Sequence, residues 1–529
     1  MNIIFNDPST SIFNFSTFIS ALALLSVIYN ITDIKFRFRI AIAPIPLHSI
    51  TFWVMLLIGT LTLLSDLWFA KKWPILSILN DQYVNQSILG FSFLGIVFTW
   101  IYFAVINPPV FNRYNYKKFA NLLFHIVLKG SENELQIIAN ELGRSAESLI
   151  LSASLKNTKK SESENYAYEL LLLLANRKFC RHLISSSPST AILLFQTMSN
   201  NKIYDLHLKQ LSRNISSEAL INKDSLLYHE DESYKSGLLG YIKPFSQSIY
   251  GDYYLVEGLA KYYGSPLDID TDLISCWDST QLKAYSRCVL ITFKSYIESH
   301  AWPTHSYALY RAFNNITTSC ESLHLINGNI LENDISKRFH VAVEFSTDLI
   351  EILDNKKPHY TNTANSFYDH IANLIFQLVK SASLVQFPSE KCWGIQYIYL
   401  WDRIFNPTSK GLVWKIIHTK LRRLIYNELI RLKEYPNYMS AKILGLCLNV
   451  MGIRLAEKQF YHGEYALHKA VISWTTKNYL YIRQKNLQVA EACLLENIKY
   501  DEKTCRLIKI YTNPLQQQPT EDFLILLNN

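Results

Sequence analysis

The sequence predicts an all-α protein that begins with three transmembrane helices. A large helical cytoplasmic region follows, arranged as an irregular α-solenoid or an array of helical hairpins. Three observations lead to this prediction. The first 107 residues contain three uncharged runs of membrane-spanning length, apolar residues recur at helical spacing through most of the remaining chain, and the 529 residues include only 16 glycines and 16 prolines. So few turn-forming residues argue against an all-β protein, and 49% hydrophobic residues argue against disorder.

The predicted membrane domain covers residues 11–107, after a short external tail at 1–10. Its three helices are expected at about 11–32, 46–66 and 87–107. The third run, SILGFSFLGIVFTWIYFAVIN, would be roughly 31 Å long as a helix, which matches the hydrocarbon core of a bilayer. One such run could be the core helix of a soluble protein, but three in succession favour a membrane domain. A cleavable signal peptide fits less well, because the first 34 residues contain no lysine or arginine.

Basic residues beside the three runs predict their orientation. Six of them would share one side of a three-span topology: Lys35, Arg37, Arg39, Arg113, Lys117 and Lys118. Only Lys71 and Lys72 would lie on the opposite side. The positive-inside rule then predicts a multi-pass protein of the cell (inner) membrane, with its N-terminus outside and its C-terminal region in the cytoplasm.

A juxtamembrane segment at 108–130 mixes basic and aromatic residues with an apolar stripe. One interpretation is an amphipathic helix on the inner leaflet, with Arg113, Lys117 and Lys118 as the membrane-surface residues. The alternative is that this helix is simply the first one of the cytoplasmic domain. The sequence supports both interpretations equally.

The polar residues of the three runs favour an anchor over a pore. No ionisable residue lies at mid-depth, since His48 and Asp66 fall near the ends of the second run. Ser16 and Ser20 have the spacing that allows close helix packing. Three helices cannot enclose a polar channel, so a pore would require a homo-oligomer. A transporter or channel subunit therefore remains as an alternative.

The cytoplasmic region is predicted to form two helical lobes, residues 131–265 and 266–529. The first lobe opens with Ser131 and Glu134, which have the spacing of a helix capping box. No fixed repeat and no phosphate-binding or dinucleotide-binding glycine motif occurs, so no cofactor is expected. His300 and His305 are expected to be isolated structural residues, because no neighbouring ligands complete a metal site.

Charge and cysteine content limit the partners and the compartment. The net charge is +8, but only 44 basic and 40 acidic residues follow residue 120, so the cytoplasmic region is nearly neutral. Near neutrality argues against nucleic acid as a partner. Eight cysteines are scattered without any C-x-x-C pair, which is typical of free thiols in a reducing compartment.

The segment 228–264 has the most unusual composition in the chain. It holds five of the 16 glycines together with many tyrosines and a short acidic run. One interpretation is a ligand-binding or interface loop, and the other is a connector between the two lobes. The candidate residues are His229, Glu230, Asp231, Glu232, Gly237, Gly240 and Gly251.

A strongly basic helix is predicted near residues 412–434. Lys415, Lys420, Arg422 and Arg423 are candidates for binding an anionic partner, above an apolar stripe that includes Trp414. The alternative is an ordinary solvated helix face paired with acidic neighbours. The apolar segment FLILL at 523–527 is expected to be either a docking segment or a last packed turn.

These features predict a membrane-tethered platform, by which we mean a helical surface that senses or recruits a cytoplasmic protein. Oligomerised spans would supply a membrane-perturbing or channel output. By analogy of architecture, such a protein would suit the role of a bacterial membrane effector in stress or antiviral defence. The main alternative is a membrane-anchored enzyme or ligand sensor, with Glu230, Asp231 or Glu232 as acid–base groups.

Overall fold

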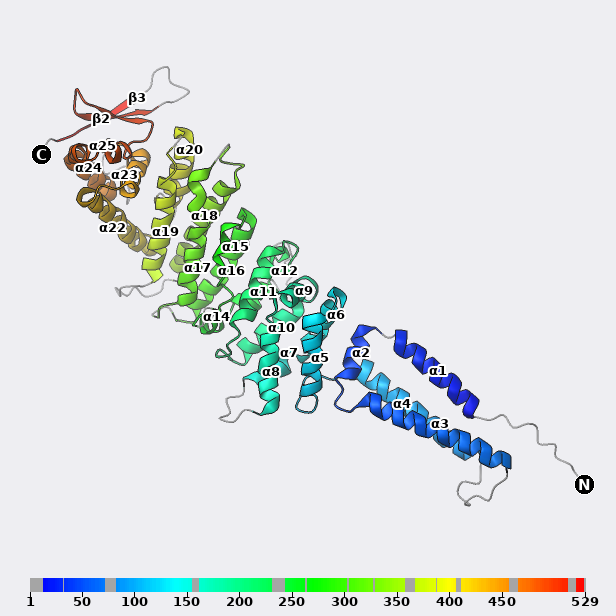
Figure 1. Cartoon of the computed structure of the whole chain (residues 1–529). Helices are drawn as coiled ribbons and strands as arrows, with labels where there is room; N and C mark the ends of the chain where they lie inside the picture. The colour runs from blue at the N-terminus through cyan, green and yellow to red at the C-terminus, as the bar shows by residue number, and fades with distance from the viewer. Residues whose placement is uncertain are drawn as a thin grey trace, which may run out of the picture. The chain divides into compact units, whose positions relative to one another are not determined.

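The chain is mostly helical, as the sequence predicts. The computed structural model describes residues 13–31, 33–71, 82–154, 161–230, 243–261, 264–301, 304–326, 329–356, 367–386, 388–405, 411–455, 465–511 and 520–527. Of these residues, 76% are helical and 4% lie in strands (Figure 1). The finer prediction of a solenoid or hairpin array stays a prediction.

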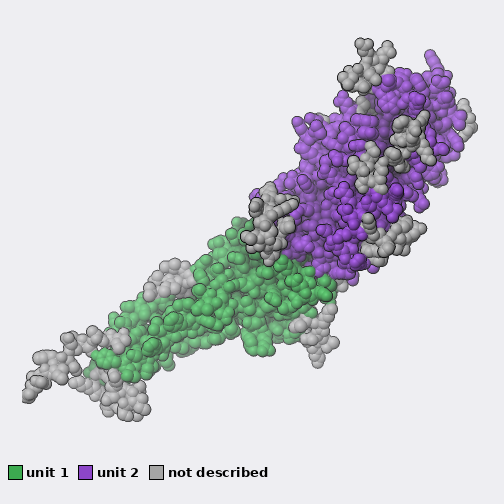
Figure 2. Space-filling model, turned by 180° about the vertical axis from the view of Figure 1, so that it is seen from behind, with its two compact units in different colours: residues 1–215 green, residues 216–529 purple. Residues whose placement is uncertain are grey.

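The chain divides into two compact units, residues 1–215 and 216–529 (Figure 2). The boundary falls within one helix, α11. The elements up to this boundary are α1 (Phe15–Ile31), α2 (Ile34–Ala41), α3 (Leu47–Lys71), α4 (Gln82–Ile101), the π-helix η2 (Tyr102–Ile106), α5 (Tyr116–Lys129), α6 (Glu132–Leu142), the 3₁₀ turn η3 (Gly143–Ser145), α7 (Ala146–Ala153), α8 (Glu162–Leu173), α9 (Arg177–Ser186), α10 (Pro188–Asn200) and α11 (Lys209–Ile221). The predicted domain boundaries at 107, 130 and 265 stay predictions.

The second unit continues with further helices and ends in a small sheet. Its elements are α12 (Leu226–His229), α13 (Pro244–Tyr250), α14 (Tyr253–Ala260), α15 (Thr271–Ser275), α16 (Ser279–Glu298), α17 (Tyr307–Thr318), the 3₁₀ turn η4 (Glu321–Leu325), α18 (Asp334–Lys356), α19 (Phe367–Ser383), α20 (Ser389–Trp393), the π-helix η5 (Gly394–Trp401), α21 (Asp402–Phe405), α22 (Leu412–Glu434), α23 (Tyr438–Met451), α24 (Tyr465–Lys485), α25 (Leu487–Glu491), β1 (Ile498–Asp501), β2 (Arg506–Tyr511) and β3 (Thr520–Ile525).

Two helices of the described chain, α3 and α4 with its π-helical extension, are long and apolar enough to span a membrane. Three such helices were expected. The first predicted run forms α1, but this helix has 17 residues and extends over roughly 26 Å, less than the hydrocarbon core of about 30 Å. Residues 11, 12 and 32 of the predicted run lie outside the described residues.

The surface of α3 and α4 is apolar and largely uncovered. Only 28% of the most apolar window of α3 is buried, and 11% of that of α4. Phe52 and Trp53 of α3 are 61% and 65% exposed, and Phe91 of α4 is 74% exposed. A core helix of a soluble protein would bury such side chains against its neighbours, so these two helices are not core helices of the described chain.

Unit 2 is built around α19, which packs against α17, α18, α22 and α23. The wide apolar face of α19 allows several neighbours to pack on it at once, and its polar residues Asp369, Asn373, Gln377 and Lys380 form one narrow stripe. Its fully buried side chains include Ile371, Ala372, Ile375, Leu378 and Val379. Figure 1 shows α16, α18 and α19 side by side, and α18 packs against both of the others.

The C-terminal residues form a three-stranded antiparallel sheet, which the sequence analysis missed. The strand order is β1-β2-β3, and Phe523 of β3 pairs with Ile508 of β2. The prediction that FLILL is a last packed turn is therefore wrong, because residues 523–525 belong to an edge strand. The fold is mostly helical with this small sheet added.

Lys509 of β2 fixes the sheet to the end of α23. It is 1% exposed, and its ammonium group donates to the carbonyl oxygen of Leu448, at 3.2 Å, and to that of Asn449. The last carbonyls of a helix have no partner within the helix, and a cation there also interacts favourably with the helix dipole. Burial lowers the pKa of Lys509 to about 8.

All eight cysteines are free. Six of them are buried, Cys505 is half-buried and Cys276 is exposed. Burial raises the pKa of the Cys288 and Cys447 thiols to about 12, so the buried cysteines are poor nucleophiles in the folded chain.

Candidate functional site

The most elaborate polar site of unit 1 lies at the base of the apolar helices and centres on Arg39. This residue is on α2, the short helix between α1 and α3, and is 7% exposed. Two N–H groups of its guanidinium donate to the two carboxylate oxygens of Glu141, at 2.6 and 2.8 Å. A third N–H group donates to the carbonyl oxygen of Ala104, at 2.7 Å. Arg39 therefore connects three elements, α2, α6 and η2.

The carbonyl group of Ala104 is available because it lies in the last turn of η2, and Pro108 and Pro109 beyond it have no backbone N–H. Helix α4 widens into a π-turn over its last residues, and the backbone N–H of Asn107 donates to the carbonyl oxygen of Tyr102. The final carbonyls of a helix lack intrahelical partners and carry partial negative charge. The guanidinium of Arg39 donates a hydrogen bond to the carbonyl group of Ala104, and its positive charge compensates the partial negative charge of the helix end.

Glu141 is held in place by the last turn of α6. This helix begins with the predicted capping box, which the structure confirms: Ser131 and Glu134 each bond to the backbone of the other. Leu135, Ile138 and Leu142 of α6 are fully buried, so the helix cannot rotate without exposing them. Glu141 stands beside this apolar face, where an unpaired carboxylate would be costly.

Helix α5 closes the same site from another direction. The side-chain amide of Asn115 donates to the carbonyl oxygen of Ile42, at 2.9 Å. The ammonium group of Lys118 donates to the carbonyl oxygen of Ala43, at 3.0 Å. Both acceptors belong to the turn between α2 and α3. We call the contacts of Arg39, Glu141, Ala104, Asn115 and Lys118 the basal junction.

The three predicted membrane-surface residues have different surroundings. Lys118 is half-buried in the basal junction. Lys117 is exposed and pairs with Glu162 of α8, at 3.0 Å. Arg113 is also exposed, and its guanidinium lies over the ring of Tyr114, 5.0 Å from the centroid. Because α5 buries Phe119 and Leu123 against its neighbours, it is a packed helix of unit 1.

Burying the Arg39–Glu141 pair has a mixed energetic effect. Taking two charges out of water costs several kcal/mol for each ion, and the bidentate geometry offsets that cost. The net contribution of such a pair to stability is therefore small, whereas breaking it by removing one partner is costly. The basal junction is thus suited to fixing how α2 and η2 meet α6.

The sequence around Glu141 contains a local signal for a buried charge. Glu141 follows Ile138 by three residues and precedes Leu142, so a carboxylate stands at the margin of an apolar stripe. A charge in that position needs a buried partner. Arg39 was interpreted only as a flanking charge, since 102 residues separate it from Glu141.

In the Gly/Tyr segment, the structure places Glu230 in a capping role. Its carboxylate is buried and accepts the backbone N–H groups of Phe245 and Ser246 and the hydroxyl of Ser246, at the start of α13. His229 ends α12, and Gly251 follows α13 as its C-cap. Asp231, Glu232, Gly237 and Gly240 lie outside the described residues.

The basic helix is α22, and its cations fall into two groups. Lys420 pairs with Asp369 of α19, and Arg431 pairs with Glu428, at 2.9 Å. Lys415 and Arg423 are exposed, and Arg422 is half-buried. Across the described part of the chain, no carboxylate lies within ion-pair distance of these last three residues.

His305 is not isolated, in contrast to the prediction. Its Nδ1 atom lies 3.2 Å from Nε2 of His370 on α19. Burial and the neighbouring His305 lower the pKa of His370. In the described ranges, no group of three or more histidine, cysteine or acidic side chains is arranged to hold a metal ion.

No protein-family model, curated protein or solved structure matches the chain.

Proposed function

We propose that the chain is an integral membrane protein whose helical remainder forms a cytoplasmic platform for a protein partner. The observation that carries this proposal is the apolar surface of α3 and α4. Both helices are of spanning length, and most of their apolar side chains have no cover within the described chain. A bilayer supplies the apolar surroundings that these side chains require.

The basal junction supports one orientation. Arg39 of α2 pairs with Glu141 of α6, so the end of α3 that follows α2 lies on the same side as the packed helices of unit 1. Helix α3 then leaves that side and α4 returns to it. The basic residues around α2 and α5 mark this side as the cytoplasm under the positive-inside rule. Because α1 is shorter than the hydrocarbon core, we propose that it crosses as a third span by thinning the bilayer locally, which puts the N-terminus outside.

The outward face of α22 is the proposed partner-binding surface. Lys415, Arg422 and Arg423 have no acidic partner in the described chain, whereas Lys420 and Arg431 are already neutralised. The exposed ring of Tyr426 lies on the same helix. Cations beside an aromatic ring suit an acidic protein surface, because arginine can form bidentate bonds to carboxylates.

The orientation is tested by labelling the full chain in intact cells with a membrane-impermeant maleimide. Cys276 is exposed and belongs to the helical remainder. We expect it to react only after the cells are permeabilised. A cysteine introduced by Ser77→Cys, in the predicted outer connection, should react without permeabilisation. Peptide mapping identifies the labelled site, and Cys276→Ser is the control that removes its signal.

Labelling of Cys276 in intact cells would overturn the proposed orientation. Labelling of both sites only after permeabilisation would contradict a crossing by α3 and α4.

The platform is tested by replacing two cations of α22. We expect Arg422→Gln/Arg423→Gln to lose a protein that crosslinks to the wild-type chain in cells, and high salt to weaken the same contact, because it is a contact between charges. The matched control is Lys283→Gln/Lys294→Gln, which removes two exposed positive charges from α16 of the same unit. If the wild type and both variants crosslink to the same proteins, α22 is an ordinary solvated helix and not the partner-binding surface.

A further inference from the structure

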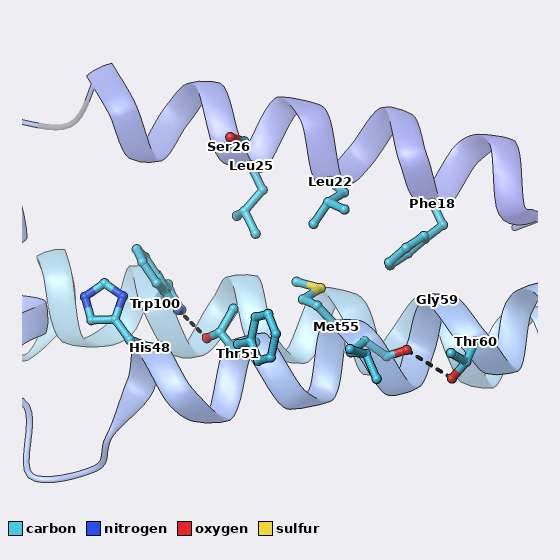
Figure 3. A pocket seen from close by; sticks show the side chains of 12 residues that line it. Phe18, Leu22, Leu25, Ser26, His48, Thr51, Met55, Gly59, Thr60 and Trp100 are labelled. Carbon is cyan, nitrogen blue, oxygen red and sulfur yellow. Dashed lines mark hydrogen bonds between the residues drawn. The ribbon is translucent and has the colours of Figure 1, made fainter.

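The apolar helices border an open groove, which none of the described side chains fills. It lies between α1 on one side and α3 and α4 on the other, and its volume is about 520 Å³. In Figure 3, Leu22 and Leu25 extend from α1 toward α3 and α4, and Met55 and Trp100 face them across the open space. We call this space the α1 groove.

One end of the α1 groove is closed by direct packing. The ring of Phe18 lies against Gly59 of α3, where an added Cβ atom would stand only 2.7 Å from the phenylalanine ring. Glycine is therefore required for this close approach. Phe18 also packs with Ile58 and Phe93, so this end is a small apolar core.

Most polar groups of the groove lie at its other end. The exception is Thr60, beside Gly59, whose hydroxyl already donates to the carbonyl oxygens of Leu56 and Leu57. His48 and Thr51 lie in the first turns of α3, and the indole N–H of Trp100 donates to the hydroxyl of Thr51, at 2.8 Å. The His48 and Trp100 rings meet edge to face, with centroids 5.7 Å apart. Ser26 of α1 adds a hydroxyl at the same end (Figure 3). If α3 crosses the bilayer, its first turns lie at the headgroup boundary, where tryptophan and other amphipathic rings are enriched.

The surroundings determine what can occupy the groove. Its middle is lined by Leu22, Leu25, Phe52 and Met55, which offer water no hydrogen bonds. Leaving it empty would forfeit dispersion contacts along its whole length. Its volume is also more than three times that of the apolar cavity of about 150 Å³ that holds benzene.

We infer that the α1 groove binds one acyl chain of a bilayer glycerophospholipid. The end of the chain lies toward Phe18 and Gly59, and the ester and glycerol region lies beside Ser26, His48 and Thr51. This inference rests on the proposed membrane insertion, because only a bilayer presents acyl chains to an open groove. The hydroxyl of Ser26 can donate a hydrogen bond to an ester carbonyl group of the lipid at this depth.

The test uses the full chain reconstituted in vesicles of phosphatidylcholine that carries a diazirine in the middle of one acyl chain. After irradiation, we expect the crosslinks to be concentrated on Leu22, Met55 and Leu56, which line the groove, above the level on the outer face of α4. The variant Leu22→Trp/Ser26→Trp fills the groove, and its groove crosslinks should fall by about tenfold, as a loss of roughly 1.4 kcal/mol in binding would produce.

The matched control is Leu94→Trp/Gly95→Trp, which adds two indoles on α4 outside the groove. Leu94 is 46% exposed and a Cβ atom at Gly95 meets no other atom within 4 Å, so both indoles are added at open positions. It should keep the wild-type crosslink map. Unchanged helix content by circular dichroism shows that both variants fold.

The outcomes separate this inference from the proposed function. Crosslinks spread evenly over the outer faces of α3 and α4 in the wild-type chain would overturn the groove site alone. Groove crosslinks that survive the filling variant would also overturn it. A chain that does not enter the vesicles would overturn both the groove site and the membrane insertion.

Discussion

Replacing Arg39 with methionine should lower the free energy of unfolding by about 3 kcal/mol, because the buried carboxylate of Glu141 then keeps only the half-exposed ammonium group of Lys35, at 3.6 Å. Glu141→Leu should have a comparable effect, since it leaves the buried guanidinium of Arg39 without a carboxylate partner. The double variant Arg39→Met/Glu141→Leu should recover most of the loss, because no unpaired charge remains. It should stay below the wild type by about 1–3 kcal/mol, since the carbonyl group of Ala104 loses its donor.

Unfolding of the full chain in detergent, followed by circular dichroism, measures this cycle. The control is Lys117→Met, which breaks an ion pair whose two side chains are 58% and 67% exposed. Its effect should be small, because solvent screens exposed pairs. If the effects of the two single substitutions simply added up in the double variant, Arg39 and Glu141 would not act as a pair.

An arginine in the middle of each apolar helix should expel the chain from the membrane. Leu57 of α3 and Phe91 of α4 are exposed and lie near the helix centres. Arginine at the centre of a span costs about 2.5–3.5 kcal/mol of insertion free energy, so Leu57→Arg/Phe91→Arg should cost roughly twice that amount. We expect the fraction of chain that resists alkaline carbonate extraction to collapse in this variant.

Phe124→Arg is the matched control for the membrane experiment. Phe124 is likewise an exposed apolar side chain, with 57% of its surface accessible, but it lies on α5, which has only 14 residues. This variant should stay with the membranes. If the Leu57→Arg/Phe91→Arg chain is retained in the membrane as well as the wild type, α3 and α4 do not lie in the hydrocarbon core. If the Phe124→Arg control is lost as completely as that variant, the added charge acts in the same way wherever it is placed.

Local patterns in the sequence determined much of the fold. The expected run at 46–66 became α3 (Leu47–Lys71), and the run at 87–107 became α4 and η2, because a long uncharged stretch forms a helix whatever surrounds it. The capping box at Ser131 and Glu134 needs only residues three apart, and it formed as predicted. The apolar stripe of α22 is also buried, because the spacing of its apolar residues along the sequence already defines one face of the helix.

Contacts between distant residues were decided only by the tertiary structure. The sheet was missed because its strands are four to six residues long and gain their stability from pairing with one another and from Lys509 at the end of α23. Glu230 became a cap because α13 begins beside it, fifteen residues along the chain. Arg39 and Glu141 meet across 102 residues, a pairing that depends on how α2, α6 and η2 pack and that no local pattern encodes.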